Sequence, residues 1–163
     1  MRYDSDMIGH LEGTVLKVSD GSCILQTGGV GYKIAPTARA LASLRGGERA
    51  SLWTYLAVRE NALDLYGFAT EDEQRLFELL LTVSGIGPKS ALAILDIASV
   101  ETLRAAISQG NASYLTKVSG VGRKTAEKIV LELRDKVGIG TLDATSAIAG
   151  DQEALEEIGR AHV

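Results

Sequence analysis

Two short stretches of this chain combine residue types that bind phosphate. Residues 83–91 read Val-Ser-Gly-Ile-Gly-Pro-Lys-Ser-Ala, and residues 118–126 read Val-Ser-Gly-Val-Gly-Arg-Lys-Thr-Ala. Two glycines around one apolar residue allow a tight turn with bare N–H groups, and a following helix adds free amides and the positive end of its dipole. Lys89 and Lys124 fall in the first turn of that helix, where a cation is unfavourable for the helix itself. We therefore expect both lysines to serve an anion.

The two copies differ from the nucleotide-binding motifs that also combine glycine with lysine. A P-loop needs glycine directly before Lys-Ser or Lys-Thr, but Pro88 and Arg123 stand there. A dinucleotide fingerprint needs a preceding strand and a third glycine, and both are missing. Ordinary helix-start turns are the simpler alternative, which the duplication with lysine at the same offset disfavours.

The residues before the two copies follow the pattern of β-strands. The expected strands span 8–18, 23–27, 30–35, 50–58 and 62–68, with a short helix over 37–44. Five short strands with one helical insertion predict a small closed or half-closed barrel, and an OB-like fold is the leading candidate.

From Thr70 the apolar period becomes helical. Thr70 and Glu73 have the spacing of a capping box at a helix start. Further helices are expected from the first copy to about residue 95, over 99–110, over 111–117, and over 123–137 as the longest. The predicted fold class is α+β: an OB-like β-barrel followed by an all-α region around the two copies.

The charge is unevenly distributed along the chain. The net charge is −4, but residues 1–70 carry seven basic and seven acidic side chains, and residues 71–137 carry nine of each. Residues 138–163 carry one basic and five acidic residues, so the whole excess lies there. Residues 117–128 hold four basic residues and one acidic residue, Glu127. A local basic patch of this kind is compatible with phosphate binding.

Groups that support catalysis or hold a metal are scarce. The chain has one cysteine, Cys23, and two histidines, His10 and His162, so we expect no catalytic site, no metal site and no cofactor. Cys23 lies in an apolar strand and is interpreted as a core residue. The lone cysteine, the absence of a signal peptide and the absence of a long apolar run predict a cytoplasmic protein without membrane contact.

Several motifs together identify a family resemblance. The paired glycine stretches resemble tandem helix-hairpin-helix motifs. With Met-Ile-Gly-His-Leu-Glu-Gly at 7–13, Gly-Gly-Val-Gly-Tyr at 28–32 and Val-Arg-Glu-Asn-Ala-Leu-Asp-Leu-Tyr-Gly-Phe at 58–68, the chain resembles the RuvA family of Holliday-junction-binding subunits. The resemblance runs from residue 7 to about residue 137, with the motifs in the right order.

The resemblance implies a non-catalytic subunit that holds an open four-way junction while the RuvB ATPase drives branch migration in recombination and repair. It also implies homotetramers or octamers, and the RuvC resolvase as a further partner. Contacts to backbone phosphates would recognise junction shape rather than sequence. The residues that the resemblance assigns to DNA binding are Gly85, Gly87, Lys89, Ser90, Gly120, Gly122, Arg123, Lys124 and Thr125.

The family also has an acidic pin on the turn between the last two barrel strands. That turn reads Glu60-Asn61 here, where the family has Glu-Asp. Like charges near the crossover repel phosphates, so the loss of one carboxylate weakens the expected pin. Asp64 would compensate only if it faced the DNA.

The resemblance also sets the expected domain organisation. We expect an extension over 1–6, the OB-like domain over 7–69, the tandem helix-hairpin-helix domain over 70–137 and a flexible linker over 138–150. Residues 151–163 are expected to be the truncated start of a third, RuvB-binding domain. The last seven residues match one reading frame of a common sequencing adapter, and we expect an artefactual tail there.

Two other functions fit part of the chain. Residues 120–125 also resemble the hairpin of helix-hairpin-helix DNA glycosylase/lyases, in which Lys124 would attack the sugar; the aspartate at the matching spacing, Asp143, falls in the expected linker. A single-strand-binding OB module would stack bases on Trp53, Tyr55 or Tyr66. We expect these aromatic residues to pack in the barrel or a subunit contact instead.

Overall fold

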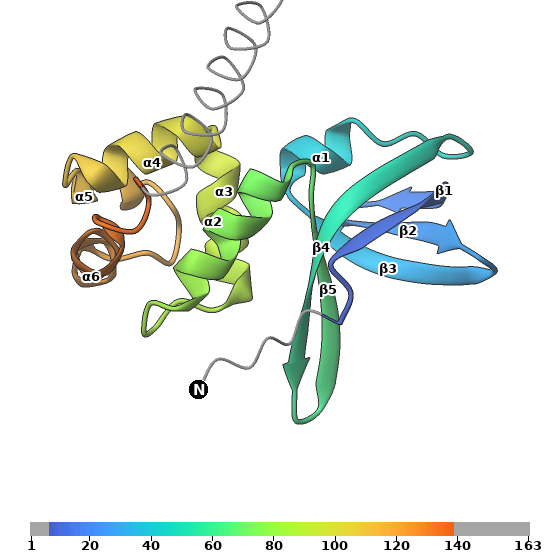
Figure 1. Cartoon of the computed structure of the whole chain (residues 1–163), viewed down its shortest axis with the longest axis horizontal. Coiled ribbons are helices and arrows are strands. Elements are labelled where there is room, and N and C mark those ends of the chain that lie inside the picture. The colour runs from blue at the N-terminus through green and yellow to red at the C-terminus, as the bar shows by residue number, and fades with distance from the viewer. Residues whose placement is uncertain (1–6, 139–163) are drawn as a thin grey trace, which may run out of the picture.

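The computed structural model describes residues 7–138, and in this range a β-barrel is followed by a group of helices (Figure 1). The predicted extension over 1–6 and the predicted segments beyond residue 138 lie outside the described residues. The elements of the barrel region are β1 (His10–Ser19), β2 (Ser22–Thr27), β3 (Val30–Pro36), α1 (Ala38–Ala42), β4 (Arg49–Arg59) and β5 (Ala62–Phe68).

The five strands of residues 7–138 close into a barrel with the order β1-β2-β3-β5-β4. β1 pairs antiparallel with both β2 and β4, and β3 pairs parallel with β5. Helix α1 makes the longer connection between β3 and β4, and the predicted OB-like barrel is thereby confirmed. A Cβ at Gly13 would overlap the carbonyl of Gln26, so the close approach of β1 to β2 at this point requires glycine.

The interior of the barrel contains apolar side chains from every strand. Cys23 is 1% exposed in this cluster beside Leu25 and Ile34. Burial raises the pKa of the Cys23 thiol, which keeps it in the unreactive protonated form. The interpretation of Cys23 as a core residue is confirmed.

The helical region follows β5 directly. Its first helix begins after Thr70, whose Oγ1 accepts a hydrogen bond from Glu73 N at 3.2 Å. Glu73 Oε2 accepts from Ala69 N at 3.0 Å, one residue before the position that a capping box predicts. The helices of the described region are α2 (Glu71–Leu81), α3 (Pro88–Ile97), α4 (Val100–Ser108), α5 (Ala112–Leu115) and α6 (Arg123–Leu133).

The prediction that residues 123–137 form the longest helix is wrong. α6 ends at Leu133 and has 11 residues, as α2 does. The chain then turns, because Val137 N and Lys136 N both donate to Leu133 O. Val137 is 1% exposed in the core, and its carbonyl accepts from Arg104 Nη1 on α4 at 2.9 Å. A contact between distant residues thus holds the segment that follows the end of α6.

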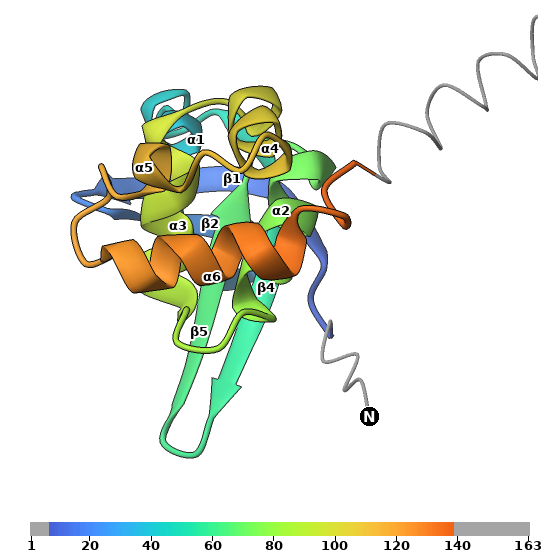
Figure 2. The same ribbon diagram turned by 90° about the vertical axis from the view of Figure 1, so that its left-hand side faces the viewer.

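Buried side chains of β4 and β5 join those of the helical region in one apolar cluster. Phe77 on α2 contacts Tyr55, Tyr66 and Phe68, with ring centroids 5.3, 5.5 and 4.8 Å apart. Gln74 Nε2 donates to Gly9 O and Thr54 O of the barrel at 3.2 and 2.5 Å. Figure 2 shows α2 lying against β4 and β5. The two regions therefore hold each other in a fixed relation.

The aromatic residues of β4 and β5 have structural contacts. Tyr66 is buried, and burial raises the pKa of its phenol. Tyr55 packs on Phe77, and Trp53 lies edge-on to His10 with ring centroids 4.9 Å apart. The expectation that Tyr55 and Tyr66 pack in the structure is confirmed.

Candidate nucleic-acid interface

The two glycine stretches form hairpins with the same backbone. Gly85 and Gly120 both have φ of +89°, a conformation that glycine adopts without strain. Ile86 N donates to Val83 O at 3.1 Å. In the second hairpin Val121 N donates to Val118 O, also at 3.1 Å. The sequence repeat is thus a repeat of structure.

Buried valine and isoleucine side chains hold each turn against the core. Val83 and Ile86 are buried in the first hairpin, as are Val118 and Val121 in the second. The glycines between them are exposed. The apolar positions of the motif therefore face inward and leave the glycine backbone at the surface.

The helices that follow the hairpins begin differently from the other helices of the described region. α1, α2, α4 and α5 each begin with a side-chain oxygen that accepts from a first-turn amide. α3 and α6 begin at Gly87 and Gly122 in extended conformation, and neither has a side-chain cap. First-turn amides have no partner within their own helix. The two uncapped starts therefore direct N–H groups and positive dipole ends outward, which suits a phosphate.

Cations stand beside both uncapped starts. Lys89 and Lys124 are exposed in the first turns of α3 and α6. Arg123 is also exposed, and its Nε lies 3.1 Å from Glu127 Oε1. An arginine at position i with glutamate at i+4 is the less favourable order on a helix, as is a cation in the first turn. Helix stability therefore does not explain the placement of Arg123.

The predicted pin turn is the tip of a long β-hairpin. Glu60 and Asn61 connect β4 to β5, and the hairpin extends away from the rest of the molecule (Figures 1 and 2). The loop between α2 and α3 points to the same side as this tip in both views. The first glycine hairpin and the pin turn thus lie toward one face.

Asp64 does not replace the carboxylate that Asn61 lacks. Arg59 Nη2 lies 2.6 Å from Asp64 Oδ2, which pairs the two charges across the hairpin. The hydrogen bond to Asp64 raises the pKa of the Arg59 guanidinium. Among residues 59–64, Glu60 is therefore the one carboxylate that forms no ion pair with a basic side chain.

Comparisons with known proteins cover both regions. A family model described as RuvA N terminal domain matches residues 7–67, and one described as SAM-like Helix-hairpin-helix tandem matches residues 77–135. A relative from Acidothermus cellulolyticus is 44% identical over 149 residues, which are 91% of this chain and 76% of the relative. The chain belongs to the RuvA family.

Further RuvA relatives give the same result. One from a Nocardioides species is 48% identical over 86% of this chain and 70% of its own length. One from Mycobacterium leprae is 42% identical over 91% of this chain and 74% of its own length. All three are named Holliday junction branch migration complex subunit RuvA. The predicted family and fold class are confirmed, and the glycosylase/lyase alternative is not favoured.

RuvA membership leaves the individual site residues as predictions. Within each hairpin, the predicted residues lie together at an uncapped helix start. The two hairpins form two separate sites, one before α3 and one before α6. Within residues 7–138, no cluster of three His, Cys, Asp or Glu side chains could hold a metal ion. In the same range no helix has the length and apolar content needed to cross a membrane.

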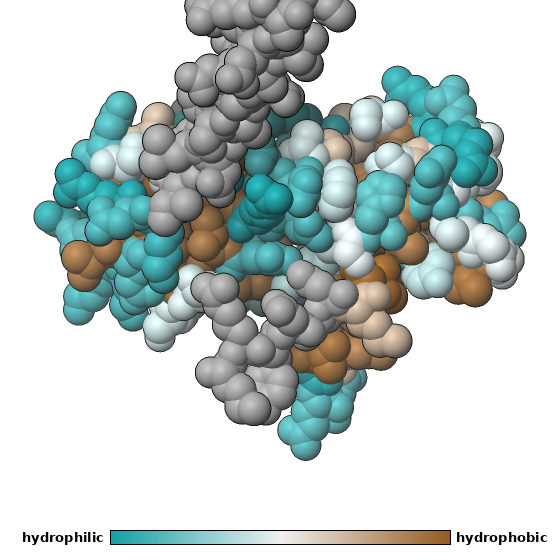
Figure 3. Space-filling view, viewed as in Figure 1, coloured by the Kyte–Doolittle hydropathy of each residue, from teal (hydrophilic) through white to brown (hydrophobic). Residues whose placement is uncertain are grey.

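Sequence reasoning missed an exposed apolar pair on the pin hairpin. Val58 and Leu63 face each other across β4 and β5 and are 61% and 70% exposed. Figure 3 shows apolar surface directly behind the hydrophilic tip. The pair is exposed because β1 and β3 pair with β4 and β5 only further from the turn, up to Trp53 and Leu65. The alternation of the strand was visible in the sequence, but the point where its neighbours end was not.

Proposed function

We propose that this chain is the non-catalytic subunit that binds four-way (Holliday) junction DNA and holds it open for branch migration in recombination and repair. The observation that supports this most strongly is the pair of glycine hairpins with matching glycine φ angles and turn hydrogen bonds, each followed by an uncapped helix start. A partner ATPase of the RuvB type supplies the energy for moving the arms.

Each hairpin contacts one stretch of DNA backbone. Amides beside Gly85, Gly87, Gly120 and Gly122 donate to phosphate oxygens, as at other helix N-termini that bind anions. Side chains add charge and hydroxyl donors to these contacts. They belong to Lys89 and Ser90 in the first hairpin and to Arg123, Lys124 and Thr125 in the second. Such contacts carry no base information, so the assembly recognises the geometry of the junction.

The β4–β5 turn separates the strands at the crossover with a reduced charge. Glu60 repels phosphates, whereas Asn61 adds no charge and Asp64 is paired with Arg59. With one free carboxylate per subunit, this pin acts more weakly than one with two.

Several copies act together. We propose a homotetramer, or an octamer of two tetramers, in which weak hairpin contacts add up through multivalency. The exposed apolar side chains Val58, Leu63 and Leu131 support self-association. We place the domain boundaries at residues 69/70 and 137/138. We place the contact with RuvB in a third domain that begins near residue 151. RuvC, the resolvase, binds the same junction. Such a subunit works in the cytoplasm.

A gel-shift comparison tests the proposal. The chain should prefer a synthetic four-way junction over a duplex of equal length and should lose affinity steeply with salt. The Lys89→Ala, Lys124→Ala double variant should lose affinity at least about 100-fold, since each removed contact to a charged group is worth about tenfold or more.

The matched control removes two lysines from the barrel. Lys17 and Lys33 are exposed on β1 and β3, on either side of Ile24. The Lys17→Ala, Lys33→Ala variant has the same net charge as the hairpin variant and should bind the junction as the wild type does. Equal affinity for duplex and junction would contradict the proposed function. Borohydride trapping on abasic DNA that depends on Lys124 would favour the lyase instead.

A further inference from the structure

The residue directly before the second hairpin is Lys117, whose side chain is oriented by a contact with an aromatic ring. Lys117 is exposed, and its Nζ lies 4.5 Å from the centroid of the Tyr114 ring. The backbone N–H of Lys117 donates to Tyr114 O at 3.4 Å. An ammonium over the face of a tyrosine ring is attracted by the ring and loses part of its rotational freedom.

The first hairpin has a different residue at the equivalent position. Thr82 N donates to Leu79 O at 3.1 Å, as Lys117 N donates to Tyr114 O. The Thr82 hydroxyl donates to the same Leu79 carbonyl at 2.6 Å, so it points back along its own helix. The two equivalent residues therefore have different roles. Thr82 caps the end of its helix, whereas Lys117 places a positive charge at the surface.

We propose that Lys117 is an additional phosphate-binding residue of the second hairpin, and that Tyr114 positions its ammonium group. This inference rests on the proposed function, which already assigns the hairpins to DNA backbone. It makes the second hairpin the stronger of the two contacts.

The charge of Lys117 is available for a phosphate. None of the ion pairs among residues 7–138 includes Lys117, whereas Arg123 shares its charge with Glu127. The contact with Tyr114 sets a direction without cancelling the charge, because the ring carries no net charge.

Lys117 directly precedes the turn that carries the exposed glycines of the second hairpin. Leu115 and Val118 are buried on either side of the exposed Thr116 and Lys117. The turn from Val118 closes through a hydrogen bond from Val121 N to Val118 O, which brings its ends within about 7 Å. A lysine on a four-carbon stem at the beginning of such a turn can reach a phosphate held by Gly120 or a neighbouring phosphate on the same strand.

The salt dependence of junction binding tests the inference on the full chain. Replacing Lys117 by alanine should weaken binding roughly threefold to tenfold at low salt. It should also reduce the slope of log K against log salt concentration by about 0.9 for each Lys117 that contacts a phosphate. Lys117→Gln should behave like Lys117→Ala, and Lys117→Arg should keep most of the slope because it keeps the charge.

The Tyr114 variants separate charge from position. Tyr114→Phe keeps the ring and should bind as the wild type does. Tyr114→Leu keeps the lysine charge but removes the ring, so affinity should fall about twofold while the salt slope stays close to that of the wild type. Thermal unfolding of each variant shows whether the fold is retained.

Arg45→Ala is the matched control for the loss of one exposed cation. Arg45 lies before β4, at the opposite end of that strand from the pin turn, and its loss should leave the slope unchanged. A Lys117→Ala protein with wild-type affinity and slope would overturn the inference, and a Tyr114→Leu protein with wild-type affinity would overturn the positioning role. If the wild type bound duplex as tightly as the junction, the proposed function would fail, but the Lys117 effect would still be measurable on duplex phosphates.

Discussion

The two hairpins of the helical region share a backbone but differ in the charged residues around it and in their contacts with the rest of the molecule. Both have a glycine at φ +89° and an uncapped helix start. The first continues with Pro88, which has no N–H, and Lys89. The second continues with Arg123 and Lys124 and is preceded by Lys117. The second hairpin therefore offers one more amide and two more cations for the same turn geometry.

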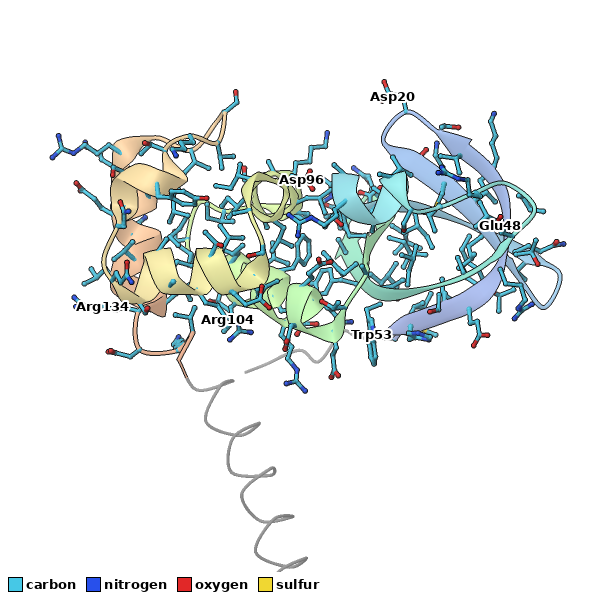
Figure 4. The ribbon with its side chains drawn as sticks, turned by 90° about the horizontal axis from the view of Figure 1, so that it is seen from above. Asp20, Glu48, Trp53, Asp96, Arg104 and Arg134 are labelled. Carbon is cyan, nitrogen blue, oxygen red and sulfur yellow. The ribbon has the colours of Figure 1, made fainter. Side chains whose placement is uncertain are left out.

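The hairpins also differ in what holds them. α3, after the first hairpin, contacts the barrel through Asp96, whose Oδ1 accepts from Ala38 N at 2.8 Å. Figure 4 shows Asp96 beside α1. α6, after the second hairpin, is followed by the Arg104 contact to Val137, which stays within the helical region. We infer that contact between α3 and the barrel region helps to position the first hairpin, whereas the second hairpin is distinguished by its additional basic side chains.

Substituting the positive-φ glycines tests whether the backbones are equivalent. Gly85→Ala and Gly120→Ala should each lower the free energy of unfolding by about 1–2 kcal/mol, because an L side chain is strained at this φ. A Cβ at either position meets no atom within 4 Å, so the effect comes from backbone strain alone. Denaturant titration of both variants measures it.

Gly46→Ala is the control for these substitutions. Gly46 is not at positive φ and also has open space, so its substitution should change the free energy of unfolding by less than about 0.5 kcal/mol. If Gly85→Ala and Gly120→Ala lowered the free energy of unfolding by different amounts, the two turns would not be equivalent.

Most of the fold could be predicted because its signals are local. Strand alternation, turn glycines and the Thr70 cap each depend on neighbouring residues, and they identified every strand and every helix start of the described region. The hairpin geometry followed from the repeated glycine spacing for the same reason.

Features that depend on tertiary contacts, or on a choice among several possible local pairings, could not be predicted. The segment after α6 is held by Arg104, which lies 33 residues before Val137. The pairing of Asp64 with Arg59 depends on the register of the β-hairpin, and the pairing of Arg123 with Glu127 is one of several helical spacings that the sequence allows. These contacts set charge at the candidate site, so the positions of the hairpins were more predictable than their electrostatics.

Removing the ion-pair partner of Arg123 increases the difference in positive charge between the two hairpins. Glu127→Gln removes an acidic group and breaks the pair that occupies Arg123, so junction affinity should rise about twofold to threefold at low salt. The free energy of unfolding should fall by no more than about 0.5 kcal/mol, as expected for an exposed i,i+4 pair. Fluorescence anisotropy with a labelled junction measures the affinity.

The chain offers a matched control on α2. Arg75 Nη2 lies 2.9 Å from Glu71 Oε1 in an exposed i,i+4 pair on α2, a helix that begins with a side-chain cap. Glu71→Gln should change stability by a similar small amount and leave junction affinity unchanged. If both variants raised affinity equally, a general loss of negative charge would explain the result, and Arg123 would have no special role.

The Asp96 contact gives the smallest expected effect and tests how the first hairpin is held. Partial burial of the carboxylate raises the pKa of Asp96, against the lowering effects of Ala38 N–H and Arg39. The folded chain therefore holds this proton more tightly than the unfolded chain. Above the folded-state pKa, the charged carboxylate lowers the free energy of unfolding. This loss of stability disappears as the pH falls through the folded-state pKa and the carboxylate becomes protonated.

Asp96→Asn keeps an oxygen for the Ala38 amide and removes the charge. At neutral pH the variant should be as stable as the wild type or more stable by less than about 0.5 kcal/mol, and the difference should vanish in acid. Asp96→Ala removes the acceptor and should lower stability by up to about 1 kcal/mol, as the loss of a helix cap does. Urea titrations at neutral and acidic pH distinguish the two variants. If Asp96→Ala matched Asp96→Asn at every pH, the hydrogen bond to Ala38 would not hold α3 to the barrel, and the first hairpin would be positioned by Gln74 and the Phe77 cluster instead.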